Sequence, residues 1–228
     1  TGAWRFGKEI RDQQQYDLFI CLPDSFSSAV MAKASGARVR IGYKKELRSA
    51  LFTQTYHKQK QLHRVEEYVN LLQQYVKRDL AIPSVGLGMP GSEKERRLVI
   101  NINSEAESRR LPVNKAISLI NGIRQQIEEE IILVGSPKEK PFVDDVYRQL
   151  ADTTGILNVA GTTSLPDLVR LFGSVSTVLT TDSGPAHVAN AAGADTIILF
   201  GAGNEHNTAP YNAGNRHIIR LGQLPCEP

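Results

Sequence analysis

The sequence predicts an α/β protein with mainly parallel sheets, arranged as two lobes. Short apolar runs typical of buried strands alternate along the chain with segments whose apolar residues follow a helical spacing. Between residues 82 and 91 the sequence Ile-Pro-Ser-Val-Gly-Leu-Gly-Met-Pro-Gly follows neither pattern, and its Pro and Gly content is typical of a linker. We therefore expect a front lobe with the linker over residues 1–90 and a back lobe over residues 91–228.

The front lobe contains few strands. A helix is expected over residues 4–15, a strand over 16–23, a helix over 25–35 that ends at Gly36, a strand over 38–43 and a helix over 62–78. Two or three strands are too few for an independent doubly wound domain, and the sequence stops abruptly at Leu-Pro-Cys-Glu-Pro, residues 224–228. This pattern favours a piece of a longer protein that lacks its first strands and its C-terminal end.

The back lobe alternates strands and helices along most of its length. Strands are expected over residues 97–102, 130–135, 156–159, 196–200 and 216–221, and helices over 113–127, 139–152 and 164–173. A further strand at Val178-Leu179 leads into a tight turn and a short helix that is closed by Gly193. This lobe is therefore expected to be whole or nearly so.

Composition and charge set broad limits on function. The hydrophobic fraction of 41% and charged fraction of 22% are those of an ordinary globular protein, and no apolar run is long enough to span a bilayer. Cys21 and Cys226 lie in no metal or redox spacing, so a reduced, cytoplasmic protein is expected. Residues 1–90 carry 14 Lys/Arg against 8 Asp/Glu, a net +6, and the remaining residues carry 13 against 16, a net −3. A basic front half suits a phosphate or an anionic membrane face, although solvated charge alone is the commoner explanation.

The turn after Val178-Leu179 is the most informative segment of the chain. Residues 180–193 read Thr-Thr-Asp-Ser-Gly-Pro-Ala-His-Val-Ala-Asn-Ala-Ala-Gly. Asp182 or Ser183 is expected to cap the helix, Gly184 to let a ligand approach the backbone, and His187 to lie one turn in. The positive end of a helix beside a hydroxyl, a glycine and an imidazole is a natural anion site, and a diphosphate is the obvious anion.

Three blocks of the sequence resemble glycosyltransferase family 9, the ADP-heptose:lipopolysaccharide heptosyltransferases. Residues 181–187, T-D-S-G-P-A-H, resemble the family signature D-[ST]-G-x-x-H, and F-G at 200–201 with N-T-A-P-Y at 207–211 resembles F-G-P-T-x-P…T-x-P-Y. Residues 16–29 and 40–43 resemble Y-D-x-x-I-x-L-P-N-S-F-x-S-A and R-x-G-Y, a pattern similar to the second heptosyltransferase type. Weaker similarities are R-R-L-P at 109–112, for K-R-W-P, and residues 159–165.

The resemblance implies two Rossmann-like lobes facing a cleft, the GT-B arrangement, with the front lobe incomplete here. It puts the nucleotide sugar on the back lobe and the acceptor, a lipid A–core oligosaccharide, on the front lobe. It also implies an inverting transfer of heptose from ADP-heptose without a cofactor. It further implies a monomeric enzyme that works on the cytoplasmic side of the inner membrane. There the enzyme would make a peripheral contact with the anionic face of the membrane.

The resemblance also suggests roles for individual residues. It assigns Asp182, Ser183, Gly184 and His187 to the donor diphosphate and sugar. Arg109 stands where the family has a phosphate-contacting lysine. An arginine in place of this lysine keeps the positive charge but alters the geometry, since arginine can bind a diphosphate through two nitrogens. The remaining donor-side assignments that it implies are Ser104 near the phosphate, Thr163 where the backbone meets the adenine, and Glu139 near the ribose.

The sequence departs from the family pattern at several positions. The family's N-P-G-A is Asn101-Ile102-Asn103-Ser104 here, the tryptophan of K-R-W-P is Leu111, and G-P-T reads Gly201-Ala202-Gly203. The family's opening strand and its G-D loop, which carries the aspartate thought to act as general base, have no counterpart in this sequence. The catalytic base therefore stays unknown.

The front lobe offers a hydroxyl-rich turn and a basic segment. The turn contains Asp24, Ser25 and Ser27, which are candidates for acceptor binding; the alternative is a helix N-cap with Phe26 as a packing residue. Residues 44–48, Lys-Lys-Glu-Leu-Arg, form either a solvated face or an electrostatic guide for a phosphorylated, membrane-borne acceptor. The sequence has no D-x-D motif and no clustered carboxylate pair in a plausible loop, so no metal is expected, and positive side chains and a helix dipole would stabilise the leaving group.

Other function classes remain as alternatives. A catalytically silent sugar-nucleotide-binding relative is favoured by the missing base loop and the altered turn at 101–104. A dinucleotide oxidoreductase would need a G-x-G-x-x-G turn, which is absent, and a sugar-nucleotide epimerase would need acid/base carboxylates that are not apparent. Nucleic-acid binding has only the mild basic charge in its favour, so no nucleic-acid partner is expected.

Overall fold

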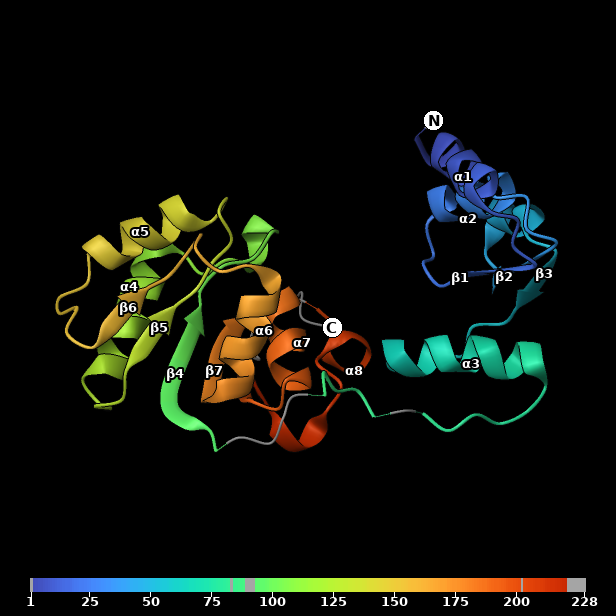
Figure 1. The fold of residues 1–228 in the computed structure, drawn as a ribbon. Helices are drawn as coiled ribbons and strands as arrows, with labels where there is room; N and C mark the ends of the chain where they lie inside the picture. Colours follow the sequence, from blue (N-terminus) through green and yellow to red (C-terminus); the bar gives the residue numbers. More distant parts are fainter. Residues whose placement is uncertain (1, 83, 89–92, 202, 221–228) are drawn as a thin grey trace. The chain divides into compact units, whose positions relative to one another are not determined.

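The computed structural model describes residues 2–82, 84–88, 93–201 and 203–220, and the chain divides into two compact units, Thr1–Pro83 and Ser84–Pro228 (Figure 1). We call these the front unit and the back unit. The division falls in the Pro- and Gly-rich stretch, of which residues 83 and 89–91 lie outside the described residues. Ala202, residue 221 of the last expected strand, and Leu224 to the terminus with Cys226 also lie outside them. Both units alternate helices with parallel strands, which confirms the α/β class.

The front unit is a three-stranded parallel sheet in the order β1-β2-β3. Its elements are α1 (Gly2–Gln13), β1 (Leu18–Cys21), α2 (Phe26–Ala34), β2 (Val39–Tyr43), the 3₁₀ helix η1 (Glu46–Leu51), β3 (Gln54–Tyr56) and α3 (Arg64–Val76). One cluster of buried residues joins α2 to the sheet, and another joins α3 to it, so the two helices cover opposite faces (Figure 1).

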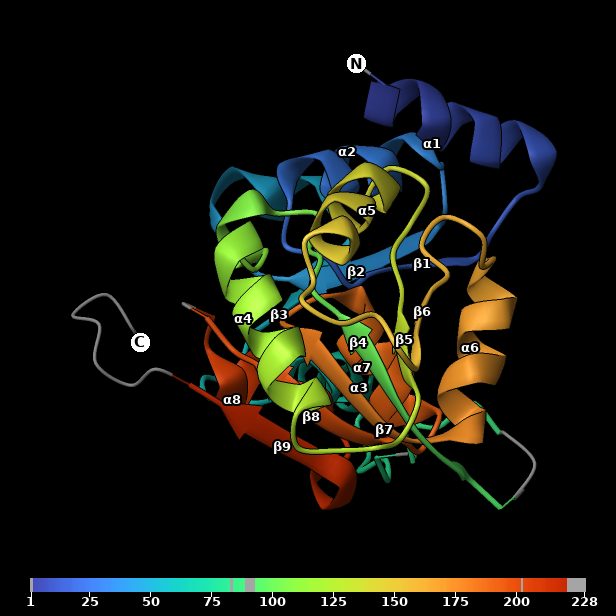
Figure 2. The ribbon, with the colours of Figure 1, turned by 90° about the vertical axis from the view of Figure 1, so that its left-hand side faces the viewer.

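The back unit is a six-stranded parallel sheet in the order β6-β5-β4-β7-β8-β9. The strands are β4 (Glu95–Asn101), β5 (Ile131–Leu133), β6 (Ile156–Asn158), β7 (Val175–Thr181), β8 (Asp195–Leu199) and β9 (Arg216–Ile219). Beside them lie η2 (Glu107–Arg109), α4 (Val113–Arg124), α5 (Lys140–Arg148), α6 (Leu165–Ser174), α7 (Gly184–Ala191), α8 (Glu205–Thr208) and η3 (Ala213–Asn215). Figure 2 shows β4 and β7 side by side within the sheet, with β9 at an edge.

Helices cover both faces of this sheet. Ala116 and Ile120 of α4 and Val143 of α5 pack in one buried cluster, whereas Phe172 of α6 and Ala189 of α7 pack in another (Figure 1). Apolar residues on both faces explain the nearly continuous apolar runs of β4 and β5, because a sheet covered on both sides has no solvent-facing row. The layers leave the carboxyl ends of the strands as the edge where loops can form a site.

Gly42 of β2 is required by a close approach of an aromatic ring. A Cβ on Gly42 would meet the Phe52 ring at 2.7, 3.0 and 3.1 Å, and Phe52 is itself buried. We expect Gly42→Ala to lower the free energy of unfolding by about 1–3 kcal/mol, because overpacking forces the ring or the strand to move. Urea unfolding followed by circular dichroism measures this loss.

Gly122 of α4 is the matched control for that substitution. No heavy atom lies within 4 Å of a Cβ placed there, so Gly122→Ala meets no obstacle and is expected to stabilise the helix by about 0.5–1 kcal/mol. If Gly42→Ala is as stable as the parent protein, the ring contact does not explain the glycine.

Candidate functional site

The strand order of the back unit fixes where a ligand site is expected. From β4 the sheet continues to β5 and β6 on one side, and from β7 it continues to β8 and β9 on the other. Successive strands are thus added on one side of β4 and then on the opposite side, so the strand order reverses between β4 and β7. In open α/β sheets, ligands bind outside the carboxyl ends of the strands at such a switch point. The loops that follow Asn101 and Thr181 are the loops at this point.

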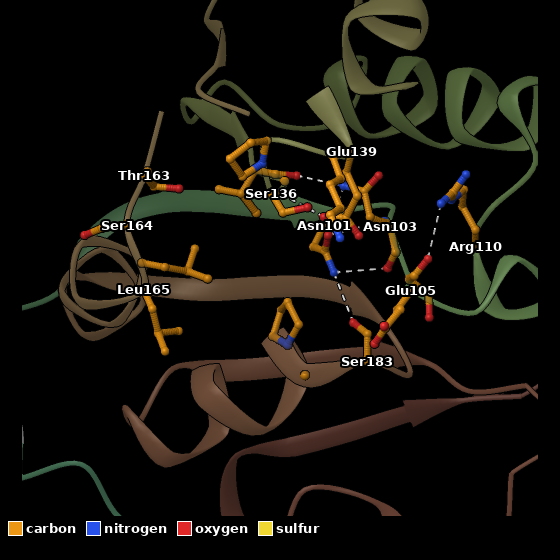
Figure 3. Close-up of a pocket in the computed structure, with 18 residues that line it drawn as sticks. Asn101, Asn103, Glu105, Arg110, Ser136, Glu139, Thr163, Ser164, Leu165 and Ser183 are labelled. Atoms are coloured by element: carbon orange, nitrogen blue, oxygen red, sulfur yellow. Dashed lines mark hydrogen bonds between the residues drawn. The ribbon is translucent and has the colours of Figure 1, made fainter. Parts of the chain in front are cut away.

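A cavity of about 610 Å³ opens at this edge (Figure 3). Its wall combines residues from the loops after β4, β5, β6 and β7. The lining residues are Asn101, Asn103, Ser104, Glu105, Arg110, Val134, Gly135, Ser136, Pro137, Lys138, Glu139, Thr163, Ser164, Leu165, Leu168, Ser183, Gly184 and Pro185. Five of the eight donor-side candidates, Ser104, Glu139, Thr163, Ser183 and Gly184, are therefore brought together in one wall. The volume suits a ligand of nucleotide size.

Helix α7 begins at this cavity. Ser183 occupies the N-cap position, but its side chain makes no capping bond, so the expectation of a side-chain cap is wrong for this residue. The hydroxyl instead donates to Thr181 O at 3.2 Å and accepts from Asn101 Nδ2 at 3.2 Å, while Gly184 and Pro185 line the cavity. The helix ends at Ala191 with Ala192 as its C-cap, and Gly193 follows with φ of +90°, as expected for a glycine just beyond a helix end. The positive end of the α7 dipole is thus directed to the cavity.

Asp182 lies one residue before this N-cap and does not line the cavity. Its backbone N–H donates to Leu199 O at 3.2 Å, and its carboxylate Oδ2 accepts from Arg109 Nη1 at 3.3 Å. The aspartate side chain is 9% exposed and that of Arg109 is 43% exposed. The pair links the loop after β4 to the loop after β7, and Arg109 itself is not among the lining residues.

Glu139 and Thr163 mark two sides of the cavity (Figure 3). Glu139 Oε2 accepts from the backbone N–H of Ser136 at 2.8 Å, which fixes the carboxylate at the start of α5. Thr163 precedes Ser164, the N-cap of α6, whose hydroxyl accepts from Asp167 N at 3.3 Å. The apolar side chain of Leu165 lies beside them in the wall. One side of the cavity is therefore carboxylate-bearing and the other is partly apolar.

Three of the eight donor-side candidates, Asp182, Arg109 and His187, do not line the cavity, and the structure adds residues to its wall. His187 lies in the first turn of α7 with an exposed side chain and is not among the lining residues. Arg110, the second arginine of the R-R-L-P block, lines the cavity, donates to Ser104 O at 3.5 Å and lies over the Phe142 ring at 5.1 Å. Asn101 and Asn103 also line it, and their departure from the family pattern was the available signal.

The comparisons with known proteins decide the family. The sequence matches glycosyltransferase family 9 (heptosyltransferase) over residues 3–228. The protein belongs to glycosyltransferase family 9. Lipopolysaccharide heptosyltransferase 2 of Escherichia coli K12 is 27% identical over 244 residues, which cover 95% of this chain and 68% of that protein. The lipopolysaccharide core heptosyltransferase OpsX of Haemophilus influenzae is 47% identical over 55 residues, 24% of this chain and 16% of that one.

A solved structure extends this likeness to the fold. The structure of E. coli ADP-heptose lps heptosyltransferase II superposes with a TM-score of 0.78 at 22% identity, over 97% of this chain and 73% of that one. The chain thus spans about three quarters of that relative.

The front unit of this glycosyltransferase contains the three acceptor-side candidates in the turn between β1 and α2. Ser25 is the N-cap of α2 and accepts from Ser28 N at 3.2 Å, and its hydroxyl lies 3.1 Å from Ser27 Oγ. The capping alternative is therefore confirmed for Ser25. The packing expected of Phe26 is wrong, since its side chain is 57% exposed.

Asp24 of this glycosyltransferase joins a network of charges. Its two carboxylate oxygens contact Arg48 Nη1 at 3.3 Å and Lys58 Nζ at 2.9 Å, and Lys58 also contacts Glu67 Oε1 at 3.1 Å. Glu67 and Arg48 are buried. Burial disfavours the ionised form of Asp24, but the hydrogen bonds and charges of Lys58 and Arg48 outweigh it and hold the pKa of Asp24 below its usual range.

This lowered pKa predicts an acid-dependent stability. A carboxyl whose pKa is lower in the folded state stabilises the fold above its unfolded pKa of about 3.9, and the contribution is lost as the pH falls through the folded value. Asp24→Asn is therefore expected to reduce the difference in urea midpoint between pH 6 and pH 3. Asp17→Asn, at a carboxylate whose side chain is 90% exposed, is expected to leave that difference unchanged. An unchanged difference in Asp24→Asn would contradict the role of the network.

Two further findings concern the described residues alone. Among them, no group of three or more His, Cys, Asp or Glu side chains is arranged to hold a metal ion. The helices that the structure describes include none with the length and apolar character needed to cross a membrane.

Proposed function

We propose that the cavity of the back unit binds the nucleoside diphosphate of ADP-heptose and that the protein transfers the heptose to the inner core of lipopolysaccharide. The observation that carries this proposal is the meeting of Ser104, Ser183 and Gly184 in one cavity at the switch point, beside the start of α7. Family membership supports the transfer, and the names of the two E. coli and Haemophilus relatives support the lipopolysaccharide acceptor.

The geometry suits the chemistry of an inverting transfer. The reaction needs a base for the acceptor hydroxyl and stabilisation of the departing nucleoside diphosphate. The dipole of α7, the Ser183 hydroxyl and the guanidinium groups of Arg109 and Arg110 supply positive potential and hydrogen-bond donors on the leaving-group side. We therefore propose that the transfer proceeds without a metal ion, and that His187 contacts the donor sugar or diphosphate at the mouth.

Calorimetric titration with ADP tests the proposal. The protein is expected to bind ADP in the micromolar range, equally well with and without EDTA, and more tightly than it binds UDP. His187→Ala is expected to weaken ADP binding. Absence of heat with ADP from a protein that is folded by circular dichroism would overturn the assignment of the nucleotide, and loss of binding in EDTA would overturn the metal-free mechanism.

The acceptor side is proposed for the front unit. Asp24, Ser25 and Ser27 lie in one turn, and the net +6 of residues 1–90 favours a phosphorylated acceptor and an anionic membrane face. We propose that the enzyme works as a monomer at the cytoplasmic face of the inner membrane, where a lipid A–core oligosaccharide is presented. Sedimentation with anionic and neutral vesicles measures the membrane contact; equal binding to both would contradict it.

A catalytically silent donor-binding relative is the second candidate. It is favoured by the turn at residues 101–104, which reads Asn-Ile-Asn-Ser where the family has N-P-G-A. A transfer assay with the full-length protein separates the two: release of ADP that depends on acceptor supports the enzyme, and ADP-heptose binding without release supports the silent relative.

A further inference from the structure

The loop after β4 places a carboxylate in the wall of the cavity. Glu105 is exposed and lines the cavity, and within the part of the chain that the structure describes its side chain has no hydrogen-bond or ion-pair partner. Arg110 lines the same cavity, but its guanidinium is held elsewhere. Its Nη2 donates to Ser104 O at 3.5 Å, and the group lies over the Phe142 ring at 5.1 Å. The carboxylate of Glu105 is therefore accessible to a ligand.

The strand order determines which parts of the cavity lie far apart. The wall takes residues from the loops after β6, β5, β4 and β7, and these strands stand in that order in the sheet. Neighbouring strands lie about 4.8 Å apart, so the loops after β6 and β4 are separated by about 10 Å. Figure 3 shows Leu165 at one end of the wall and Arg110 at the other, with Glu105 lying toward Arg110.

The chemistry of the wall sets the direction in which a sugar nucleotide can bind. The end after β6 carries Leu165 and Leu168 of α6, an apolar surface that suits a nucleobase. The switch-point end carries the start of α7, whose helix dipole suits the diphosphate. The ribose joins these two groups and therefore lies between them, on the side of β5. The transferred sugar is attached to the other end of the diphosphate, so it continues from the switch point away from the base.

The carboxylate of Glu105 restricts which part of this ligand it can contact. An ionised carboxylate only accepts hydrogen bonds, so the ligand group must be a donor. The diphosphate is an anion that repels the carboxylate. The base lies at the opposite end of the wall, and the ribose lies on the β5 side, where the wall has the carboxylate of Glu139. The hydroxyls of the transferred sugar are the donors that remain at the Glu105 end.

We propose that Glu105 accepts hydrogen bonds from the hydroxyls of the transferred sugar and thereby distinguishes the sugar nucleotide from the free nucleoside diphosphate. The inference rests on the proposed nucleotide site and adds to it a specificity-determining residue. A terminal phosphate gains a negative charge when the sugar leaves, because its second ionisation occurs near pH 6. The same carboxylate that binds the sugar thus repels the product, and it favours the donor over ADP.

The test measures the effect of Glu105→Gln on two ligands, ADP-heptose and ADP, by calorimetry on the whole chain in EDTA. The substitution keeps the shape of the side chain and removes its charge. ADP-heptose is expected to bind about tenfold more weakly, because hydrogen bonds from its hydroxyls to an ionised group are lost. ADP is expected to bind equally well or up to about threefold more tightly, because a repelling charge is removed. A purely structural effect would weaken the binding of both ligands.

Glu107→Gln is the matched control. Glu107 begins η2 in the same loop, is exposed and does not line the cavity, so this variant loses the same charge outside the wall. Both ligands are expected to bind it as tightly as they bind the wild type. If Glu107→Gln reproduces the change seen in Glu105→Gln, the effect belongs to the net charge of the loop and the inference is wrong.

The remaining outcomes separate this inference from the proposed function. An equal loss of both affinities in Glu105→Gln would assign the carboxylate to the nucleotide or to the fold, and unchanged ADP-heptose binding would show that it does not contact the sugar. Either result, or binding of ADP without ADP-heptose by the wild type, overturns the inference and leaves the nucleotide site standing. If the wild type binds neither ligand, the proposed function fails and the inference fails with it.

Discussion

Arg109→Ala is expected to weaken ADP binding about 100-fold, because the substitution removes a cation and also unpairs an anion. A charge-assisted hydrogen bond to a diphosphate contributes about 1.5–3 kcal/mol. Arg109 Nη1 lies 3.3 Å from Asp182 Oδ2, and the side chain of Asp182 is only 9% exposed. Without the guanidinium this carboxylate would repel the incoming diphosphate at the start of α7. Calorimetric titration at constant ionic strength measures the loss.

A second substitution separates the two effects. Asp182→Asn in the Arg109→Ala background removes the unpaired charge and is expected to recover about tenfold of the affinity, while Arg109→Lys keeps most of it. Arg96→Ala is the control, because Arg96 belongs to the amino end of β4 and its side chain is 85% exposed. If Arg109→Ala binds ADP as tightly as Arg96→Ala does, the guanidinium does not contact the diphosphate.

The sequence predicted the elements that carry long apolar runs or strong turn signals. The strands around Val99 and Ile132 were predicted correctly because burial restricts their residues to apolar types. The end of the helix before Gly193 was predicted correctly because a positive φ favours glycine. The strand β3 was missed because it has three residues, Gln54 to Tyr56, none of them aliphatic, and takes its structure from pairing with β2. Pairing between segments is not recorded in local periodicity.

The same limit applies to the candidate site. The sequence brought forward Ser183 and Gly184 because a hydroxyl or glycine at a helix N-terminus has a local reason to bind an anion, whereas Ser104 came from the family resemblance. It treated Asn103 only as a departure from a family pattern. The amide of Asn103 donates a hydrogen bond to Val134 O, which is 31 residues away in the chain. The two residues meet only because of the order of the strands. Which loops meet at the switch point is a property of topology and not of any one segment.

Arg48 illustrates how a charge pattern is ambiguous before the fold is known. It belongs to the segment of residues 44–48 that suggested a solvated or acceptor-guiding face. Lys44 and Lys45 are exposed, as both a solvated face and a guide for the acceptor require. Arg48 is only 3% exposed, so the prediction of a surface position is wrong for this residue. Its guanidinium donates to Pro23 O at 2.8 Å, contacts Asp24 Oδ1 at 3.3 Å and lies over the Phe52 ring at 5.2 Å. Arg48 thus joins η1 to the turn that holds the acceptor-side candidates.

Arg48→Ala is therefore expected to lower the free energy of unfolding by about 3–5 kcal/mol, the largest loss of stability predicted here for a single substitution. The change leaves the Pro23 carbonyl without this donor, removes one of the two cations that contact Asp24 and opens a cavity beside Phe52. Arg48→Met keeps the apolar stem and is expected to recover about 1–2 kcal/mol of the loss, because the packing against the ring returns while the polar contacts do not. Urea unfolding at pH 7 measures all three proteins, with Arg38→Ala as an exposed control whose side chain is 82% accessible. A value for Arg48→Ala within about 0.5 kcal/mol of that control would mean that the buried guanidinium gains no more from its partners than it loses on leaving water.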